Sequence, residues 1–440
     1  MLRASSFPAL AVLQIRDFRI LWAARWTHEV SRRMELLVLG YLILQLTDSP
    51  FQVGLIAVFL NAPRPVLALF AGVIADRLDR RRIMVGAQAS YFGIAATLLV
   101  LLITGAIQPW HVFIAILLQG SGKVLDDPSR RTAIFDLAGQ GRIASAMSLE
   151  TITNNGGKVL GPLAGGLLIA ESGFIGAYTV LAAFDLASLL LMVRLRLPHR
   201  KLASRPPTTV WHSLREGIGH SLTNRMVLGV LCISLVVNAL VFPIQYFIPV
   251  IASDLLLVGP ILGGLLGSAE GIGTLVGALI IAVRRDIRYH GRLFVAGALM
   301  VSLAVTLVAW SPWFALSFTL LLLGGMAQAG FSTMQSTILL LASLPEIRGR
   351  TVGALGMVNG LGHLLGGSEI GAIANVFGIG LAIGLNAGVG LLLILPVIIL
   401  TPLVWQPVGS ISEETIHDEE PSGLKPLPNT SGDSPGAKQI

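Results

Sequence analysis

The sequence predicts an all-α membrane protein with twelve transmembrane helices, arranged as two six-helix bundles around a central cavity. Three observations support this fold class. First, 54% of the 440 residues are hydrophobic and only 12% are charged, whereas soluble domains carry roughly one quarter charged residues. Second, the apolar residues form blocks long enough to cross about 30 Å of hydrocarbon. Third, Lys and Arg are concentrated in alternate breaks between these blocks.

The apolar blocks define the twelve expected spans. In the first half of the chain they lie near 18–46, 51–75, 83–105, 110–135, 143–170 and 174–197. In the second half they lie near 225–252, 260–283, 291–311, 313–343, 350–375 and 378–403. A short apolar core followed by a small-residue cleavage site is not found near the start, so we expect the first helix to remain in the mature chain.

The distribution of basic residues predicts the orientation in the membrane, because Lys and Arg near helix ends stay on the cytoplasmic side. One set of loops contains Arg77, Arg80, Arg81, Arg82, Arg142, Arg194, Arg196, Arg200, Lys201, Arg205, Arg284, Arg285, Arg288, Arg292, Arg348 and Arg350. The other set, around 47–50, 105–110, 171–173, 253–259, 311–313 and 375–378, contains none. We therefore expect a multi-pass cell-membrane protein with both termini cytoplasmic. The net charge of +7 records this asymmetry and gives no reason to expect a nucleic-acid partner.

A polar, basic segment divides the spans six and six. The expected domains are an N-terminal bundle at 1–197, a cytoplasmic linker at 198–224, a C-terminal bundle at 225–405 and a disordered cytoplasmic tail at 406–440. The tail is rich in Glu, Pro, Ser and Gly and cannot bury apolar area. "GRIASAMSLE" from Gly141 and "GRTVGALGMV" from Gly349 occupy corresponding places. This correspondence suggests that the two bundles are a parallel repeat.

The loop "GVIADRLDRRRIM" resembles the signature of the major facilitator superfamily, with matches at Gly72, Asp76, Arg77, Arg80 and Arg81. Asp79 stands where glycine is usual. The "DRLDRRR" form is similar to the siderophore and multidrug exporter (enterobactin-exporter-like) branch. An acid at a helix end can pair with arginines and hold the cytoplasmic side closed, so we expect a gating loop. For the arginines, the alternative is that they only satisfy the positive-inside bias.

A second pattern, "GKVLGPLAGG" in the fifth span, resembles the motif of antiporters in this superfamily. The matching residues are Gly157, Gly161, Pro162, Gly165 and Gly166. Glycines at four-residue spacing form a smooth stripe against which another helix can pack, and the proline permits a bend. Packing alone is the alternative reading. Pro128 and Arg130 also match the siderophore-exporter branch, whereas Ile116 replaces a membrane-embedded arginine that the resemblance would imply.

The stretch "ARWTHEVSRRMELL", residues 24–37, carries six ionisable side chains. A first span starting only at Met34 would be about 20 Å long, too short for a bilayer, so the stretch must lie inside the membrane. At 100° per residue, all six side chains fall within an arc of roughly 160°. One reading is a self-neutralised face with pairs Arg25–Glu29, Glu29–Arg33 and Arg32–Glu35. The other is that this stripe lines the transport cavity.

Polar residues at membrane depth provide the candidate site. The cavity and substrate candidates are Arg25, His28, Glu29, Arg32, Glu35, Asn61, Arg64, Lys123, Asp126, Glu150, Asn154, Lys158, Asn238, Gln328 and His363. The excess of cations in the first half suggests that an anionic group is tolerated or preferred. A proton carrier must be an acid that can bind a proton inside the membrane. The candidates are Glu29, Glu35, Glu150 and Glu270.

We therefore expect a secondary active transporter that exports a small amphipathic compound, such as a drug or siderophore, by proton-coupled alternating access, with an anionic group tolerated or preferred. The first alternative is an uptake or facilitated-diffusion carrier. An alternative of another class is a membrane sensor or assembly partner that transports nothing. A metal site is not expected, because the eight histidines lack ligand spacing and the chain has one cysteine. An enzyme is not expected either, because no Ser/His/Asp set has a suitable context, and no cofactor is expected. We expect a monomer whose partners are the lipid bilayer, protons and a small-molecule substrate.

Overall fold

The computed structural model describes residues 12–65, 67, 79–197, 219, 224–283, 289–343 and 348–406, and every regular element in these ranges is helical. The first half (described residues 12–197) contains α1(Arg16–Thr47), α2(Pro50–Asn61), α4(Arg80–Ile103), α5(Pro109–Ala138), η2(Gln140–Arg142) and α6(Ile143–Arg194). The second half (described residues 224–406) contains α8(Arg225–Leu240), η3(Phe242–Tyr246), α9(Ile248–Val250), η4(Ile251–Leu255), α10(Pro260–Val283), α11(His290–Val308), α12(Phe314–Ala342), α13(Arg348–Phe377) and α14(Ile379–Leu400).

Local sequence signals set the ends of these helices. Pro50 and Pro109 lie in the first turns of α2 and α5, where a missing N–H costs nothing. The Asp79 carboxylate caps α4 by accepting hydrogen bonds from the backbone N–H groups of Arg81 (2.7 Å) and Arg82 (3.3 Å). Gly173 lies inside α6 with φ 65°. Because this left-handed conformation suits glycine, Gly173 separates the two spans that α6 contains.

The all-α prediction is confirmed in the described part of the chain, where every predicted span overlaps helical residues. The spans do not all match single helices, because 143–170 and 174–197 both lie in α6, and 225–252 is divided among α8, η3, α9 and η4. The predicted continuation of α2 to residue 75 lies largely outside the described part, as do almost all of the linker 198–224 and the tail 406–440. Within the described ranges, seven helices are long and apolar enough to cross a membrane by length and composition alone. Helix α1 is not among them, and it carries the charged 24–37 stripe.

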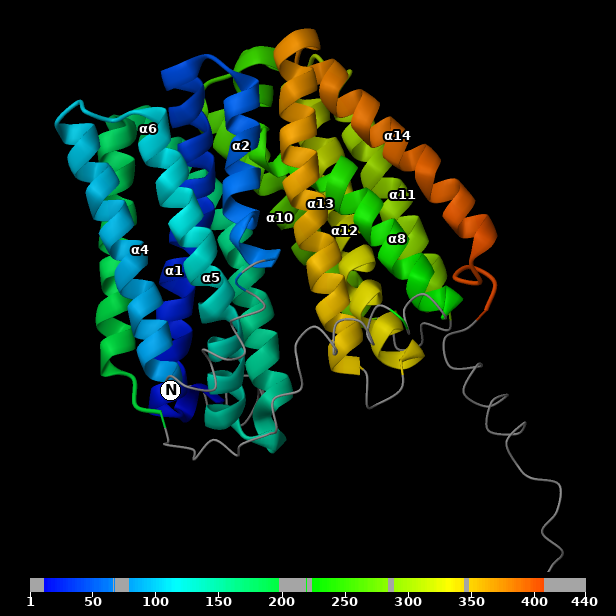
Figure 1. Ribbon diagram of the computed structural model, residues 1–440, viewed down its shortest axis with the longest axis horizontal. Coiled ribbons are helices and arrows are strands. Elements are labelled where there is room, and N and C mark those ends of the chain that lie inside the picture. Colours follow the sequence, from blue (N-terminus) through cyan, green and yellow to red (C-terminus); the bar gives the residue numbers. More distant parts are fainter. Residues whose placement is uncertain are drawn as a thin grey trace, which may run out of the picture.

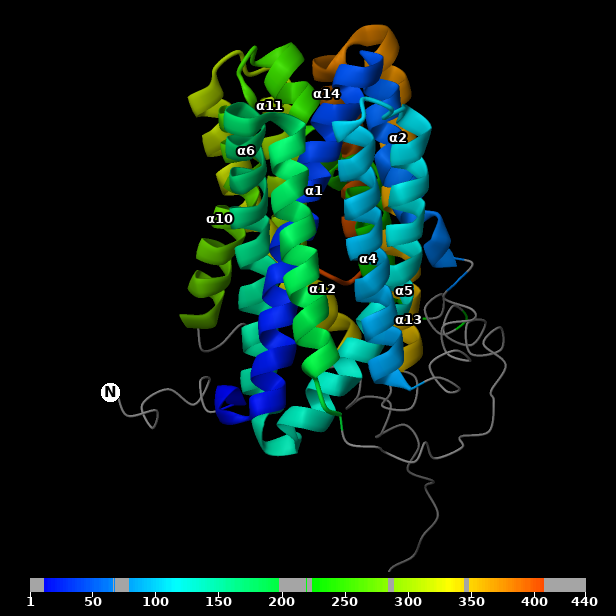
Figure 2. The same cartoon turned by 90° about the vertical axis from the view of Figure 1, so that its left-hand side faces the viewer.

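Figure 1 shows the helices of the first half on the left and those of the second half on the right. Helix α1 begins near the lower edge, where α4, α6 and α8 also start. This edge holds the ends that carry Arg80, Arg142, Arg194 and Arg225, and it is called the basic end. The opposite edge, whose loops lack Lys and Arg, is called the non-basic end. Figure 2 shows α1 running through the first half, beside α6.

The two halves meet at the non-basic end and diverge toward the basic end (Figure 1). Two helix pairs, α6 with α10 and α2 with α13, make the main contacts between them. At the non-basic end, the Ser49 hydroxyl donates a hydrogen bond to Asn375 Oδ1 at 3.0 Å. Backbone also meets backbone there, because Gly166 and Gly264 pack directly against each other. The described conformation is thus closed at the non-basic end.

Candidate functional site

A cavity of about 340 Å³ lies between the two halves. Helices α1, α2, α5 and α6 form one wall, and α8, η3, α10, α12 and α13 form the other. Nine of the residues singled out from the sequence line it: Arg32, Asn61, Arg64, Lys123, Lys158, Asn238, Gln328, His363 and Glu270. Arg33, which belongs to the 24–37 stripe, lines it as well.

The two walls differ in charge. Every cation of the lining, namely Arg32, Arg33, Arg64, Lys123 and Lys158, comes from the first half. Arg64 and Lys123 make no side-chain hydrogen bond or ion pair with another described residue. The second half contributes amide side chains and a cluster of aromatic rings. In this cluster the Phe242 and Phe331 ring centroids lie 5.6 Å apart, and the Tyr246 and His363 ring centroids lie 6.1 Å apart. The cavity can therefore hold a molecule with an anionic part and an apolar part.

An ion pair crosses the cavity from one half to the other. Lys158 Nζ on α6 lies 3.2 Å from Glu270 Oε1 on α10, and it also donates to Gln328 Oε1 at 3.2 Å. Thr274 donates to the same Gln328 oxygen at 3.0 Å. Both charged side chains retain more than a fifth of their exposure. Glu270 has no charged neighbour on its own helical turn, but Lys158 of the other half supplies one.

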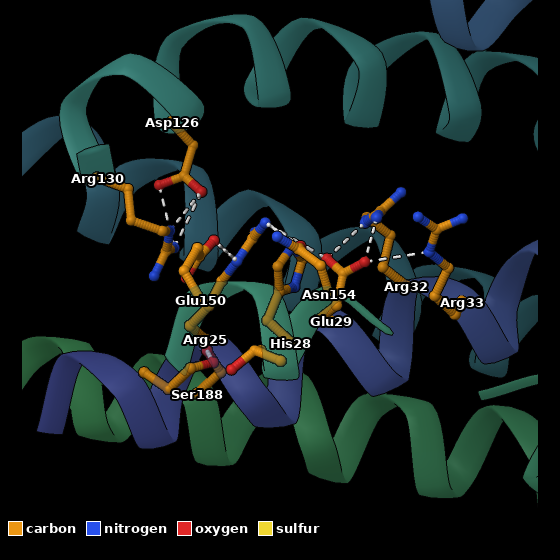
Figure 3. Close-up of polar contacts among 12 residues, drawn as sticks. Arg25, His28, Glu29, Arg32, Arg33, Asp126, Arg130, Glu150, Asn154 and Ser188 are labelled. Atoms are coloured by element: carbon orange, nitrogen blue, oxygen red, sulfur yellow. Dashed lines mark hydrogen bonds and ion pairs between the residues drawn. The ribbon is translucent and has the colours of Figure 1, made fainter. Parts of the chain in front are cut away.

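Glu29 is the centre of the 24–37 stripe and is fully buried. Its carboxylate binds three guanidinium groups of its own helix: Arg25 at 3.5 Å, Arg33 at 3.0 Å and Arg32 (Figure 3). The predicted pairs Arg25–Glu29 and Glu29–Arg33 are confirmed. The predicted pair Arg32–Glu35 is wrong. The Arg32 guanidinium instead contacts Glu29, one helical turn earlier, which also binds Arg25 and Arg33.

Seven residues predicted for the cavity do not line it. Two of them, His28 and Glu35, line another pocket, and the other five are Arg25, Glu29, Asp126, Glu150 and Asn154. Arg25 donates to Glu150 Oε1 at 3.0 Å and to Asn154 Oδ1 at 3.1 Å, so these groups join α1 to α6 within the first half (Figure 3). Asp126 forms a buried ion pair with Arg130 at 2.9 Å on α5. Charges at membrane depth need partners, and these five find them inside one half.

His28 and Glu35 lie in a second, smaller pocket inside the first half, together with Tyr91, Gln119 and Asp185. Neither Asp185 nor the glutamines Gln88 and Gln119 were predicted from the sequence as site residues. Asp185 carried a usable signal, since it is an acid within the apolar run "LAAFDLASLLL", and an acid inside a transmembrane segment is a functional candidate by default.

The described part of the gating-loop motif ties three helices of the first half together. Arg80 forms an ion pair with Asp136 of α5 at 2.6 Å. Arg81 donates to the carbonyl oxygens of Leu195 (2.7 Å) and Val193 at the end of α6, a place where a cation is favoured by the helix dipole. Gly72, Asp76 and Arg77 lie outside the described residues. Gating by this loop stays a prediction.

The glycines of the antiporter-like motif face two different helices. A Cβ atom added to Gly157 would lie 2.7 Å from Glu29 Cγ, and one added to Gly165 would lie 3.2 Å from Met34 Cγ. Gly161 likewise packs on α1, beside the Met34 backbone. Pro162 and Gly166 instead face Gly264 of α10, in the other half. The motif therefore packs against α1 on one face of α6 and against α10 of the other half on another face.

The chain matches known proteins over most of its length. A family described as transmembrane secretion effector matches residues 7–422. The multidrug efflux pump Tap of Mycolicibacterium fortuitum is 27% identical, over 82% of this chain and 89% of its own. The enterobactin exporter EntS of Escherichia coli is 26% identical, over 86% and 91%. The crystal structure of the nucleoside transporter NupG superposes with a TM-score of 0.71 at 16% identity, over 88% and 99%, which supports the fold.

These relatives are membrane transporters, and the apolar helices place this chain in a membrane as well. The predicted resemblance to the siderophore and multidrug exporters is confirmed. The chain belongs to the transmembrane secretion effector family and is a transporter of the major facilitator superfamily.

Proposed function

We propose that the protein is a secondary active exporter that carries a small amphipathic compound with an anionic group out of the cytoplasm. The observation that carries this proposal is the cavity between the halves, whose first-half wall holds Arg64 and Lys123 without a partner among the described residues. Its volume of about 340 Å³ suits a small ligand, since ligand pockets range from about 300 to 1,000 Å³.

Alternating access is proposed as the transport mechanism, with the halves 1–197 and 225–405 rocking about the cavity. The positive-inside rule supports a cytoplasmic basic end, with both termini on that side. On that assignment, the described conformation receives cargo from the cytoplasm. The antiporter-like motif and the exporters among the relatives support the outward direction. The loop around Asp76 is proposed to hold the basic end closed in the opposite state, and the protein is proposed to act as a monomer.

Inward proton flow is the proposed driving force. An anion moving out and a proton moving in both move charge along a negative-inside potential, which contributes about 2.3 kcal/mol per charge per 100 mV. Among the four candidate carriers, Glu29 and Glu150 are held by arginines. Glu270 forms an ion pair with Lys158, so protonating Glu270 would also break an ion pair between the two halves. Glu35 has no ion pair with a described residue and is taken up below.

The test is accumulation in inside-out vesicles with an acidic lumen, using a panel of carboxylate, neutral and cationic dyes as probes. We expect carboxylate dyes to accumulate and to leak out when an uncoupler dissipates the gradient. Lys123→Met should lower their accumulation about tenfold or more, because a charged hydrogen bond is worth about 1.5–3 kcal/mol. Arg142→Met, at an exposed position outside the cavity, is the matched control.

Each alternative gives a different result in this assay. Accumulation only in right-side-out vesicles would identify an uptake carrier and overturn the proposed direction. Accumulation of no dye in either orientation would favour a sensor or assembly partner. Equal losses in Lys123→Met and Arg142→Met would contradict the role of the cavity cations.

A further inference from the structure

The second pocket of the first half is too small for cargo. Its volume is about 40 Å³, enough for a few water molecules, since one water needs about 10–15 Å³ by the same kind of measure. It is bordered by α1, α2, α4, α5 and α6, and its lining includes His28, Glu35, Gln119 and Asp185. A cluster of titratable groups in so small a space is suited to water and protons.

Glu35 is the buried acid of this pocket, with 5% of its surface exposed. Its carboxylate accepts one hydrogen bond, 2.7 Å long, from the neutral amide of Gln119. Within the described residues, no Lys, Arg or His lies within ion-pair distance of it. Glu29, six residues earlier on α1, has three guanidinium partners. Burying an ionised carboxylate without a cation is so costly that such a group takes up a proton instead.

His28 and Asp185 form a buried pair next to Glu35. His28 Nδ1 lies 3.2 Å from Asp185 Oδ1, and these side chains are 7% and 4% exposed. The Tyr91 ring stacks on the imidazole at 4.6 Å, and the Gln88 amide lies 3.5 Å from the same nitrogen. The pair joins α1 to α6 and supplies a second group that can exchange a proton with water in the pocket.

The titratable and charged groups that face Glu35, besides His28, come from four of the five helices around the pocket, since α2 contributes only the apolar Ile56 and Leu60. These groups are Arg32 on α1, Tyr91 on α4, Lys123 on α5, and Tyr178 and Asp185 on α6. Arg32 and Lys123 line both this pocket and the central cavity. The pocket is therefore adjacent to the cargo cavity, and these two cations, with Leu36 and Leu60, form the partition between them.

We propose that Glu35, supported by Gln119 and the His28–Asp185 pair, carries the coupling proton in a site that cargo does not enter. This inference rests on the proposed proton-coupled export. It assigns the proton to the first half, whereas Glu270 keeps its ion pair with Lys158 and faces the cargo cavity. Proton and cargo then use separate sites on either side of Arg32 and Lys123.

The first test is an infrared pH titration of the purified full-length protein, which needs no cargo. We expect a protonated-carboxyl band at neutral pH that is absent in Glu35→Gln and unchanged in Glu270→Gln. Gln119→Leu keeps the acid but removes its hydrogen bond, and it should shift the band. Glu35→Gln should fold normally, because the amide resembles a protonated carboxyl. A spectrum that is unchanged in both Glu35→Gln and Gln119→Leu would overturn the proposal.

The second test uses the dye-loaded vesicles. Glu35→Gln should lose gradient-driven accumulation but keep dye exchange in the absence of a gradient, while the exposed-site control Glu171→Gln keeps both. Gradient-driven accumulation by Glu35→Gln at the wild-type level would defeat this inference and leave export intact. Failure of the wild type to accumulate any dye would defeat the proposed function, and the infrared result would still decide the protonation of Glu35.

Discussion

Replacing Gly166 by leucine is expected to abolish transport while leaving each half folded. A Cβ atom at this position would lie 2.9 Å from Gly264 Cα and 3.0 Å from Gly264 N, with the Pro260 carbonyl oxygen also in contact. These are backbone atoms of the other half, so they cannot move aside as a side chain does. Helices α6 and α10 would have to separate, and the non-basic end would not close. The measurement is dye accumulation in inside-out vesicles.

Gly93→Leu is the matched control, because Gly93 is exposed on α4 and a Cβ atom there has nothing within 4 Å. It should leave accumulation at the wild-type level. Thermal unfolding of both purified variants checks that the halves remain folded. Wild-type transport by Gly166→Leu would show that direct contact between these helix backbones is dispensable for the cycle.

Replacing Glu29 by glutamine is expected to destabilise the protein more than any other single change in the first half. Glu29 is fully buried and forms ion pairs with Arg25, Arg32 and Arg33. Without it, Arg32 and Arg33 lose their carboxylate partner at membrane depth while Arg25 keeps Glu150, and breaking a buried ion pair costs about 3–5 kcal/mol. We expect low expression and a strongly lowered unfolding temperature, measured on purified protein.

Glu150→Gln is the comparison variant for this prediction. It removes one partner of Arg25, but Arg25 keeps Glu29 and the 3.1 Å hydrogen bond to Asn154. Its effect on the unfolding temperature should be clearly smaller. Equal unfolding temperatures for wild type and Glu29→Gln would mean that the arginines find other partners. That result would contradict a stabilising role for Glu29.

Much of the fold is predictable, because the apolar blocks locate the helices and the basic residues mark the loops on one side of the membrane. The boundaries of α10 match the predicted span, and the break at Gly173 lies between two predicted spans. Within α1, helical spacing predicted two of the three Glu29 pairs. The third pair, Arg32–Glu29, was not predicted. Helical spacing allows Arg32 to reach either Glu29 or Glu35, and the choice between them depends on the neighbouring side chains.

Contacts between helices were not predictable from the sequence alone. Lys158 and Glu270 are 112 positions apart, and His28 and Asp185 are 157 apart. Whether such groups meet depends on how each helix is rotated and how closely its neighbours pack, which hydrophobicity does not specify. For the same reason, the sequence placed Glu150 and Asn154 in the cavity, although they face α1.

The central claim is that the two halves close alternately around the cavity. Ser49 and Asn375 bridge the halves at the non-basic end, with side-chain oxygens 3.0 Å apart. The double variant Ser49→Cys with Asn375→Cys is therefore designed for cross-linking across the halves by a thiol oxidant or a short bifunctional thiol reagent. The native Cys232 is first replaced by serine, and Ser49→Cys alone is the control. We predict that the cross-link stops dye accumulation and that a reductant restores it. Undiminished accumulation by fully cross-linked protein would contradict the account.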